Sequence, residues 1–224
     1  MSLRENPKLK PAAAGAATLL ILVGAYLGLM AVLHRSPSLN SAEVVPGKLI
    51  RSGQPETGDL DRIKERDGLG TILCLRGKED PEVKAWAERN GVKLLSLQLW
   101  ADDPPQPAQI GLFFDIMRGA TVDLAKYQDV ILQPRSVTED QVRFPFPVLI
   151  HCEGGSDRAG IMVALYRVAF QGWSPADAKR EMIRHFHLPF VHPALFEFLD
   201  RMAPRLTPDF GSRSKPEKEK PGQD

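Results

Sequence analysis

The chain has 224 residues, of which 43% are hydrophobic and 25% are charged, which is enough for one compact α/β domain with attached segments. Its formal net charge of +1 gives no overall field that would attract nucleic acid, so we expect no nucleic-acid partner. Two cysteines without a CxxC motif provide neither a disulfide framework nor a zinc cluster, and we expect no structural metal and no cofactor.

The N-terminal region predicts a membrane anchor. A basic segment, 1–11, precedes an apolar run at 12–33 that contains no charged residue and is long enough to cross a bilayer as a helix. A cleaved signal peptide is an alternative, but the run exceeds the roughly 7 to 15 residues of an h-region and no small-residue cleavage site follows closely. A buried core helix would require an amphipathic pattern, which the run lacks. We predict a single transmembrane helix at 12–33.

Positive charge is denser before this run than directly after it, which predicts a cytoplasmic N-terminus. The domain would then face outward, into the periplasm in a Gram-negative cell. The polar, proline-containing stretch 34–44 is typical of a linker. We place the folded domain at 45–204 and predict a disordered tail at 205–224, where proline, glycine and mixed charge lack apolar periodicity.

Within the domain, short β-rich runs alternate with helical patterns. The strand candidates are "KLIRS", "TILCLR", "KLLSLQL" and "PVLIHC". Alternation of this kind predicts an α/β fold with a central, mostly parallel sheet of four or five strands flanked by helices. After "HCEGGSDRAG" the remaining domain is predicted to be helical, and "GWSPADAKREMIRHF" has a clear helix start, with Ser174 as N-cap and Pro175 in the first turn.

The turn after the last strand candidate carries the chemistry. Cys152 and Arg158 are separated by five residues that include Gly154 and Gly155. A loop of this length can point successive backbone N–H groups inward as an anion nest, closed by the N-terminus of the next helix. Arg158 can hold two phosphate oxygens in a planar fork, and the same positive environment stabilises a Cys152 thiolate.

This pattern resembles the C-x5-R loop of the cysteine-dependent protein tyrosine phosphatases. "IRSGQP", "TILCLRG" and "ALYRVAFQGWSPADA" are similar to the atypical dual-specificity branch of bacteria and fungi. The resemblance implies a dual-specificity phosphatase-like fold and a cysteinyl-phosphate mechanism. It also implies that Cys152 is the nucleophile, that Arg158 binds phosphate and that His151 supports the loop. The cradle would be formed by the amides of Glu153, Gly154, Gly155, Ser156, Asp157 and Arg158.

The mechanism also needs a general acid. Trp100-Ala101-Asp102 in "LWADDPPQP" resembles the W-P-D loop of classical tyrosine phosphatases, and we favour Asp102 over Asp103. Acidic residues in a proline-rich loop are also commonly just solvated, and many relatives lack an aspartate here, so the alternative that neither residue is the acid stays open.

Two departures from the family pattern concern speed and substrate. Ala159 stands where the family usually has a serine or threonine that hydrogen-bonds the thiolate, which predicts slow phosphoenzyme hydrolysis and a gain in kcat for Ala159→Thr. Glu153 and Asp157 place two carboxylates in the loop, and their charge would repel a multiply phosphorylated ligand. We therefore expect a phosphorylated protein or a small phosphomonoester as substrate. The alternatives are a weak or inactive phosphate-binding module, an inositol phosphate phosphatase, and a sulfurtransferase.

Other residues receive no chemical role from the sequence. Arg51, Ser52 and Gln54 are expected to fold close to the pocket in this family, with a role that could be turn-making. Cys74 is interpreted as a core residue, with a redox partnership to Cys152 as the alternative. The histidines His185, His187 and His192 lack the spacing of a metal site and are interpreted as local packing.

Overall fold

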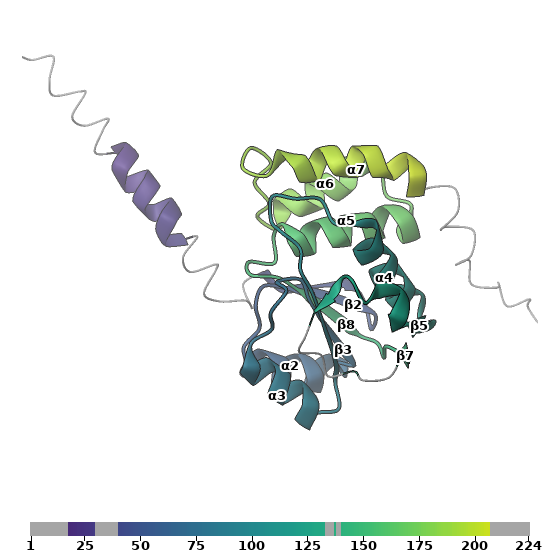
Figure 1. The fold of residues 1–224 in the computed structure, drawn as a ribbon. Helices are drawn as coiled ribbons and strands as arrows, with labels where there is room; N and C mark the ends of the chain where they lie inside the picture. Colours follow the sequence, from purple (N-terminus) through teal and green to yellow (C-terminus); the bar gives the residue numbers. More distant parts are fainter. Residues whose placement is uncertain (1–17, 30–39, 133–136, 138–139, 207–224) are drawn as a thin grey trace, which may run out of the picture.

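The computed structural model describes residues 18–29, 40–132, 137 and 140–206. Residues 18–29 form a helix, drawn in purple in Figure 1. The predicted transmembrane helix extends beyond both ends of this segment, and among the helices that the structure describes none is long and apolar enough to cross a membrane. The basic N-terminal segment, most of the linker and nearly all of the predicted tail lie outside the described residues.

The domain is built on a sheet of six strands in the order β1-β2-β8-β3-β4-β6. The central four are parallel, and β1 and β6 pair antiparallel at the two edges. The strands are β1 (Ala42–Val45), β2 (Leu49–Ser52), β3 (Thr71–Cys74), β4 (Lys93–Leu97), β6 (Ile131–Leu132) and β8 (Val148–His151). A separate antiparallel pair joins β5 (Thr121–Asp123) to β7 (Gln141–Arg143).

All four predicted strands form the parallel centre of the sheet, which confirms the α/β fold class. The prediction of four or five strands was too low, because β1 and β6 extend the sheet to six. β6 has only two residues, and β1 has one buried residue among four where β2, β3 and β8 each have four, so neither has the buried apolar run that marks the central strands.

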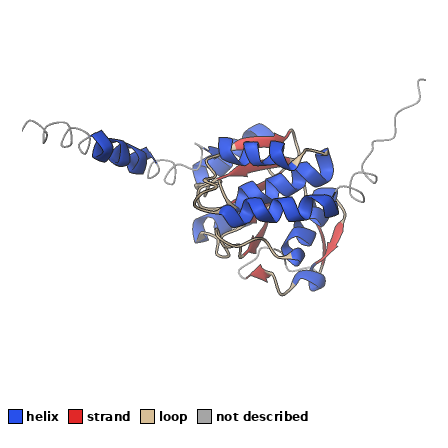
Figure 2. Ribbon diagram, turned by 90° about the horizontal axis from the view of Figure 1, so that it is seen from above, coloured by secondary structure: helices blue, strands red, loops and turns tan. Residues whose placement is uncertain are grey.

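Helices cover both faces of the sheet (Figures 1 and 2). Alternate strand residues point to opposite faces. Ile50, Ile72 and Leu149 form one core with α2 (Thr57–Asp67) and α3 (Pro81–Arg89). Leu49, Leu73 and Ile150 join the larger core on the other face, against α4 (Pro107–Arg118), α5 (Arg158–Gln171), α6 (Pro175–Arg184) and α7 (Pro193–Leu206). The short 3-10 helix η2 (Leu124–Tyr127) follows β5.

The predicted start of α6 is confirmed. The Ser174 hydroxyl accepts a hydrogen bond from the Asp177 amide at 3.1 Å, and Pro175 is the first helical residue. α6 packs on α5, the helix that begins at Arg158. The segment between α6 and α7 is therefore held close to the loop that precedes α5.

Candidate active site

The loop from Cys152 to Asp157 joins the central strand β8 to α5. β8 lies between the parallel strands β2 and β3, so the loop starts at the carboxyl edge of the sheet, where α/β folds bind ligands. Cys152 is 1% exposed, and α5 begins at Arg158. The predicted order of strand, glycine turn and helix is present.

Gly155 fixes the path of this loop. Its φ is +70°, and a Cβ atom added there would lie 2.7 Å from the Gly53 nitrogen and from the Ser52 carbonyl carbon. Its carbonyl oxygen accepts a hydrogen bond of 2.5 Å from Nη2 of Arg51, a fully buried side chain on β2. Only glycine fits between the loop and the end of β2, so the "IRSGQP" segment supports the loop directly.

Burial lowers the pKa of Arg51 to about 10, which leaves the guanidinium positive at neutral pH. Its Nε and Nη1 atoms are buried without a hydrogen-bond partner among the described residues. A positive charge therefore lies under the loop, on the side of the sheet that α5 covers, where it favours an anion in the loop above.

Asn40, at the N-terminal end of the described domain, also holds this loop. Its amide nitrogen donates to the Gly154 carbonyl at 2.6 Å and to the His185 carbonyl at 3.2 Å, and its oxygen is 2.9 Å from Nδ1 of His185. Burial, together with the charge of Arg51, lowers the pKa of His185 to about 4. His185 is therefore neutral at physiological pH and ties the end of α6 to Asn40.

The N-terminus of α5 is left uncapped by side chains. Asp157 occupies the N-cap position, where aspartate ordinarily accepts from a first-turn amide. Here its carboxylate is 2.7 Å from Nδ1 of the buried His187 and makes no cap hydrogen bond. Nε of Arg158 is buried and has no partner within the described part of the chain. The first-turn amides and Arg158 are thus available to an anion.

Glu153 is the second loop carboxylate, and it also has a partner. Its Oε2 atom is 2.7 Å from Nε of Arg76, which follows β3. Nη1 of Arg76 donates to Gln54 at 2.6 Å, and Nε2 of Gln54 donates to Glu79 at 2.9 Å. Both loop carboxylates are therefore partnered by cationic or histidine side chains. We revise the expectation that they act as bare negative charges against a phosphorylated ligand.

The polar contacts that run from Arg76 through Gln54 to Glu79 end at His151, the residue before Cys152. Nε2 of His151 is 2.6 Å from Oε2 of Glu79, and both side chains are fully buried. Burial alone would lower the pKa of His151, but Cys74 and Glu79 raise it to about 10. Burial alone would raise the pKa of Glu79. The charge of His151 and the hydrogen bonds from His151, Gln54 and the Asp80 amide outweigh this effect and lower the pKa to about 2. His151 and Glu79 form a buried ion pair next to the nucleophile position.

Cys74 completes this buried cluster. Cys74, Glu79 and His151 offer ligand atoms within 4.8 Å of one another, which makes them the one possible group of metal ligands in the residues described. The contact between Glu79 and Nε2 of His151 needs no ion, and Nδ1 of His151 is buried without a hydrogen-bond partner among the described residues. Both cysteines are free thiols, and Cys74 lies in the core, as expected from its strand.

The acid-loop candidates differ in their surroundings. The Asp102 side chain is 79% exposed, and its Oδ1 atom is 2.5 Å from Nδ1 of His192, in the segment before α7. Nε2 of His192 is 3.8 Å from Oδ2 of Asp157. Asp103 has no hydrogen-bond partner among the described residues. The structure therefore brings Asp102, and not Asp103, into contact with His192, which in turn lies 3.8 Å from Asp157 in the loop.

Sequence reasoning missed several of these residues. His187 and His192 were interpreted as local packing, yet they contact Asp157 and Asp102. Asn40, Arg76 and Glu79 were assigned no role from the sequence. The available signal was that Arg76 and Glu79 follow a strand that ends at the same edge of the sheet as β8.

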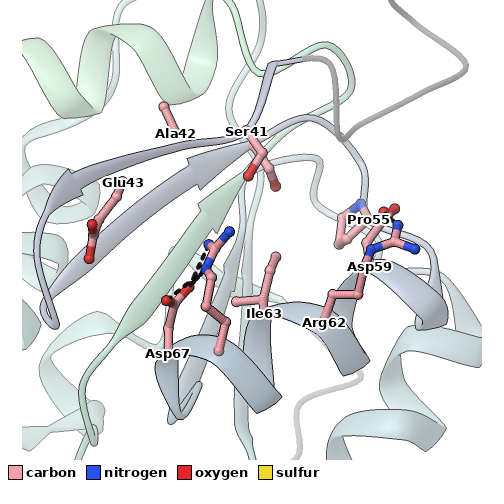
Figure 3. A pocket seen from close by; sticks show the side chains of 10 residues that line it. Ser41, Ala42, Glu43, Pro55, Asp59, Arg62, Ile63 and Asp67 are labelled. Atoms are coloured by element: carbon pink, nitrogen blue, oxygen red, sulfur yellow. Dashed lines mark hydrogen bonds and ion pairs between the residues drawn. The ribbon is translucent and has the colours of Figure 1, made fainter.

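A separate cavity of about 480 Å³ lies between β1 and α2 (Figure 3). It reaches the end of β2 at Ser52 and Pro55, but neither Cys152 nor Arg158 lines it. Its two arginines, Arg62 and Arg66, are paired with aspartates in their own helix. The cavity therefore does not share the anion-binding groups of the loop.

Comparisons with known proteins agree with the fold. The catalytic core of Siw14 superposes with a TM-score of 0.53 at 21% identity, over 72% of this chain and 83% of that one. A second structure of the Siw14 core, in complex with citrate, is described as that of the PP-IP phosphatase from S. cerevisiae. TpbA from P. aeruginosa, in complex with phosphotyrosine, superposes with a TM-score of 0.52 at 21% identity, over 76% of this chain and 92% of that one.

Curated relatives have similar sequences. The dual specificity protein phosphatase TpbA of Pseudomonas aeruginosa is 28% identical over 146 residues, which is 65% of this chain and 54% of TpbA. The tyrosine-protein phosphatase-like protein OCA2 of Saccharomyces cerevisiae is 26% identical over 151 residues, 65% of this chain and 64% of OCA2. The chain thus matches about half the length of TpbA.

A family model matches residues 39–187, which is two thirds of the chain and includes the loop 152–157. Its description is "PTP-SAK: Swiss Army Knife protein, DSP-PTPase phosphatase domain". The resemblance to the atypical dual-specificity phosphatases is confirmed. The chain belongs to this family of cysteine-dependent phosphatase domains.

Proposed function

We propose that the domain hydrolyses phosphomonoesters through a cysteinyl-phosphate intermediate, with aryl phosphates of the phosphotyrosine type as its preferred substrates. The observation that carries the proposal is the loop 152–157, which joins a buried cysteine to an uncapped helix N-terminus that begins with Arg158. Uncapped amides and a fork of guanidinium donors match the oxygens of a phosphoryl group.

In the first step the Cys152 thiolate forms an S–P bond while the bond from phosphorus to the leaving oxygen breaks, and that oxygen takes a proton from Asp102. In the second step water attacks phosphorus and gives its proton to the Asp102 carboxylate, and the S–P bond breaks. Inorganic phosphate leaves and the thiolate is restored. Arg158 and the loop amides hold the phosphoryl oxygens through both steps.

Exposed apolar residues support an aryl leaving group. Apart from the helix at 18–29, the large apolar side chains that are exposed in the described residues are Trp100, Ile183, Phe186, Phe190 and Val191. Trp100 is in the segment of Asp102, and Phe186, Phe190 and Val191 are in the segment of His192, which the contact of Asp102 with His192 brings together; Ile183 is on α6, directly before it. An aromatic ring or apolar neighbours of a phosphotyrosine would bury surface there. The TpbA structure with phosphotyrosine shows that a protein of this fold binds such a group.

The full chain should hydrolyse para-nitrophenyl phosphate, and Cys152→Ser should lower kcat by at least about 1,000-fold, since the covalent step is lost. Equal rates for the two proteins would exclude the mechanism. Phosphopeptide binding without hydrolysis would favour the alternative of a phosphate-binding module. Phosphotyrosine peptide, phosphoserine peptide and an inositol pyrophosphate, compared by phosphate release, separate the substrate classes. A preference for the inositol compound would contradict the aryl assignment.

The membrane anchor also stands as a proposal. It rests on the charge-free run at 12–33 and on the basic residues before it. Expression of the full chain in a Gram-negative host should place it in the carbonate-resistant membrane fraction, with the domain accessible to protease in spheroplasts. Recovery in the supernatant, or protection from the protease, would contradict the anchor or the orientation respectively.

A further inference from the structure

Four side chains from three separate segments form one polar row beside the phosphate loop. Asp102 lies in the segment after β4, Asp157 directly precedes α5, and His187 and His192 lie between α6 and α7. Asp102 contacts Nδ1 of His192 at 2.5 Å, and Nε2 of His192 faces Asp157 at 3.8 Å. Asp157 contacts Nδ1 of His187 at 2.7 Å. The row therefore connects the acid candidate to the N-terminus of the phosphate-binding helix.

The two ends of this row differ in burial. The His187 side chain is fully buried, and its ring packs on Phe196 with a centroid distance of 4.7 Å. Asp157 is 23% exposed and His192 is 19% exposed, whereas Asp102 is 79% exposed. Within the described part of the chain, His192 is the only hydrogen-bond partner of Asp102. The exposed carboxylate is thus held at one point, by a ring that belongs to the opposite segment.

We infer that His192 is a positioning residue that holds the Asp102 carboxyl group at the mouth of the phosphate loop. The inference rests on the proposed function, because it assigns His192 a role only through Asp102 as general acid. His192 bonds to Oδ1 of Asp102, so Oδ2 remains to carry the proton to the leaving oxygen as the bond from phosphorus to that oxygen breaks.

The geometry gives His192 a specific effect on the reaction. An exposed carboxylate without a partner samples several rotamers, and proton transfer needs it within hydrogen-bond reach of the leaving oxygen. Misplacement of a catalytic group by about 1 Å costs about 100-fold in rate. The loss depends on how much the leaving group needs a proton. An ester with a poor leaving group needs the acid, and one with a good leaving group does not.

A purely structural role for His192 would have a different signature. The ring also faces Asp157 at the start of α5, and its loss could disturb the phosphate cradle. A disturbed cradle would weaken binding and slow the reaction of every phosphomonoester, because all of them use the same loop. Comparison of two esters that differ only in the leaving group separates the two roles.

The test compares phenyl phosphate, a poor leaving group, with para-nitrophenyl phosphate, a good one, using the full chain. Asp102→Asn is expected to lower kcat on phenyl phosphate by about 100-fold and on the nitrophenyl ester by less than about fivefold. His192→Ala should reproduce this selectivity, with a loss of about tenfold on phenyl phosphate and little change in KM. His192→Asn, which keeps a donor nitrogen near the position of Nδ1, should recover most of that loss.

The double variant of His192→Ala and Asp102→Asn should be no slower than Asp102→Asn alone, since the histidine acts through the aspartate. Glu197→Gln, at an exposed position on α7, is the matched control, and we expect both esters to react with it at the wild-type rate.

Equal losses on the two esters, additive losses in the double variant, or no recovery with His192→Asn would overturn the inference while leaving a Cys152-dependent phosphatase in place. Activity that persists in Cys152→Ser would instead overturn the proposed function and the inference with it.

Discussion

Replacement of Glu79 by glutamine tests the buried ion pair beside the nucleophile. Glutamine has the same shape, and its Oε1 atom can still accept the hydrogen bonds from Gln54 and from the Asp80 amide. The change removes the negative charge that faces Nε2 of His151 at 2.6 Å and puts an amide NH2 group in place of the acceptor oxygen there. A buried histidine that loses its counter-ion must give up its proton or remain as an uncompensated charge, and either outcome destabilises the fold.

The expected magnitude follows from the pKa of Glu79, which the fold lowers from 4.5 to about 2. At about 1.4 kcal/mol per pH unit, this corresponds to about 3 kcal/mol of stability. The pKa of His151 is displaced further, from 6.5 to about 10, because Cys74 also contributes to it. The value for Glu79 is therefore the better measure of what the substitution removes.

The sign of the pH dependence differs for the two partners. The Glu79 contribution is present above pH 4.5 and is lost as the pH falls toward 2. The His151 contribution is present below pH 6.5 and is lost as the pH rises through about 10. The difference in unfolding free energy between wild type and Glu79→Gln should therefore be largest between about pH 4.5 and 6.5.

Urea unfolding from pH 3 to pH 9 measures this difference, with Glu82→Gln, an exposed position in the first turn of α3, as control. A difference below about 1 kcal/mol at pH 5.5, or one that stays constant down to pH 3, would refute the ion pair as the source of stability.

Two further substitutions test the loop itself. Gly155→Ala places a Cβ atom 2.7 Å from backbone atoms at the end of β2 and should lower the free energy of unfolding by at least about 2 kcal/mol more than Gly91→Ala does. Gly91 has a similar φ of +64°, but a Cβ atom there meets no atom within 4 Å. Thermal unfolding of both variants measures the difference, and equal melting temperatures would contradict the steric argument. Ala159→Ser offers a hydroxyl to the Cys152 thiolate from a buried position on α5, and should raise kcat about tenfold and shrink the pre-steady-state burst, with Ala178→Ser as a control for a buried hydroxyl on a neighbouring helix. A burst of unchanged size would count against slow phosphoenzyme hydrolysis.

The centre of the fold was predictable because its signals are local. Apolar runs of four or five residues mark the parallel strands, and the glycine pair after "VLIHC" marks the turn into α5. Two adjacent residues, Ser174 as N-cap and Pro175 as first helical residue, define the start of α6. Each of these features depends on the conformational preference of a short segment, which a single sequence contains.

The contacts that complete the site were not predictable in the same way. Asp102 and His192 are 90 positions apart, and Asn40 and Gly154 are 114 positions apart. Nothing in the local pattern distinguishes Glu79, which is buried beside His151, from its neighbour Asp80, which caps α3. Such pairings follow from which loops the packed helices bring together, and that depends on tertiary structure.

The position of Asn40 at the start of the domain limits where the domain can act. It is the residue at which the described fold begins, and its side chain is bonded to Gly154 in the phosphate loop. Residue 40 is joined to the helix at 18–29 by ten intervening residues, which can span no more than about 40 Å even when fully extended. With the helix held in a membrane, as proposed, the phosphate loop would be confined to a short radius, and substrates would have to come to it within that distance.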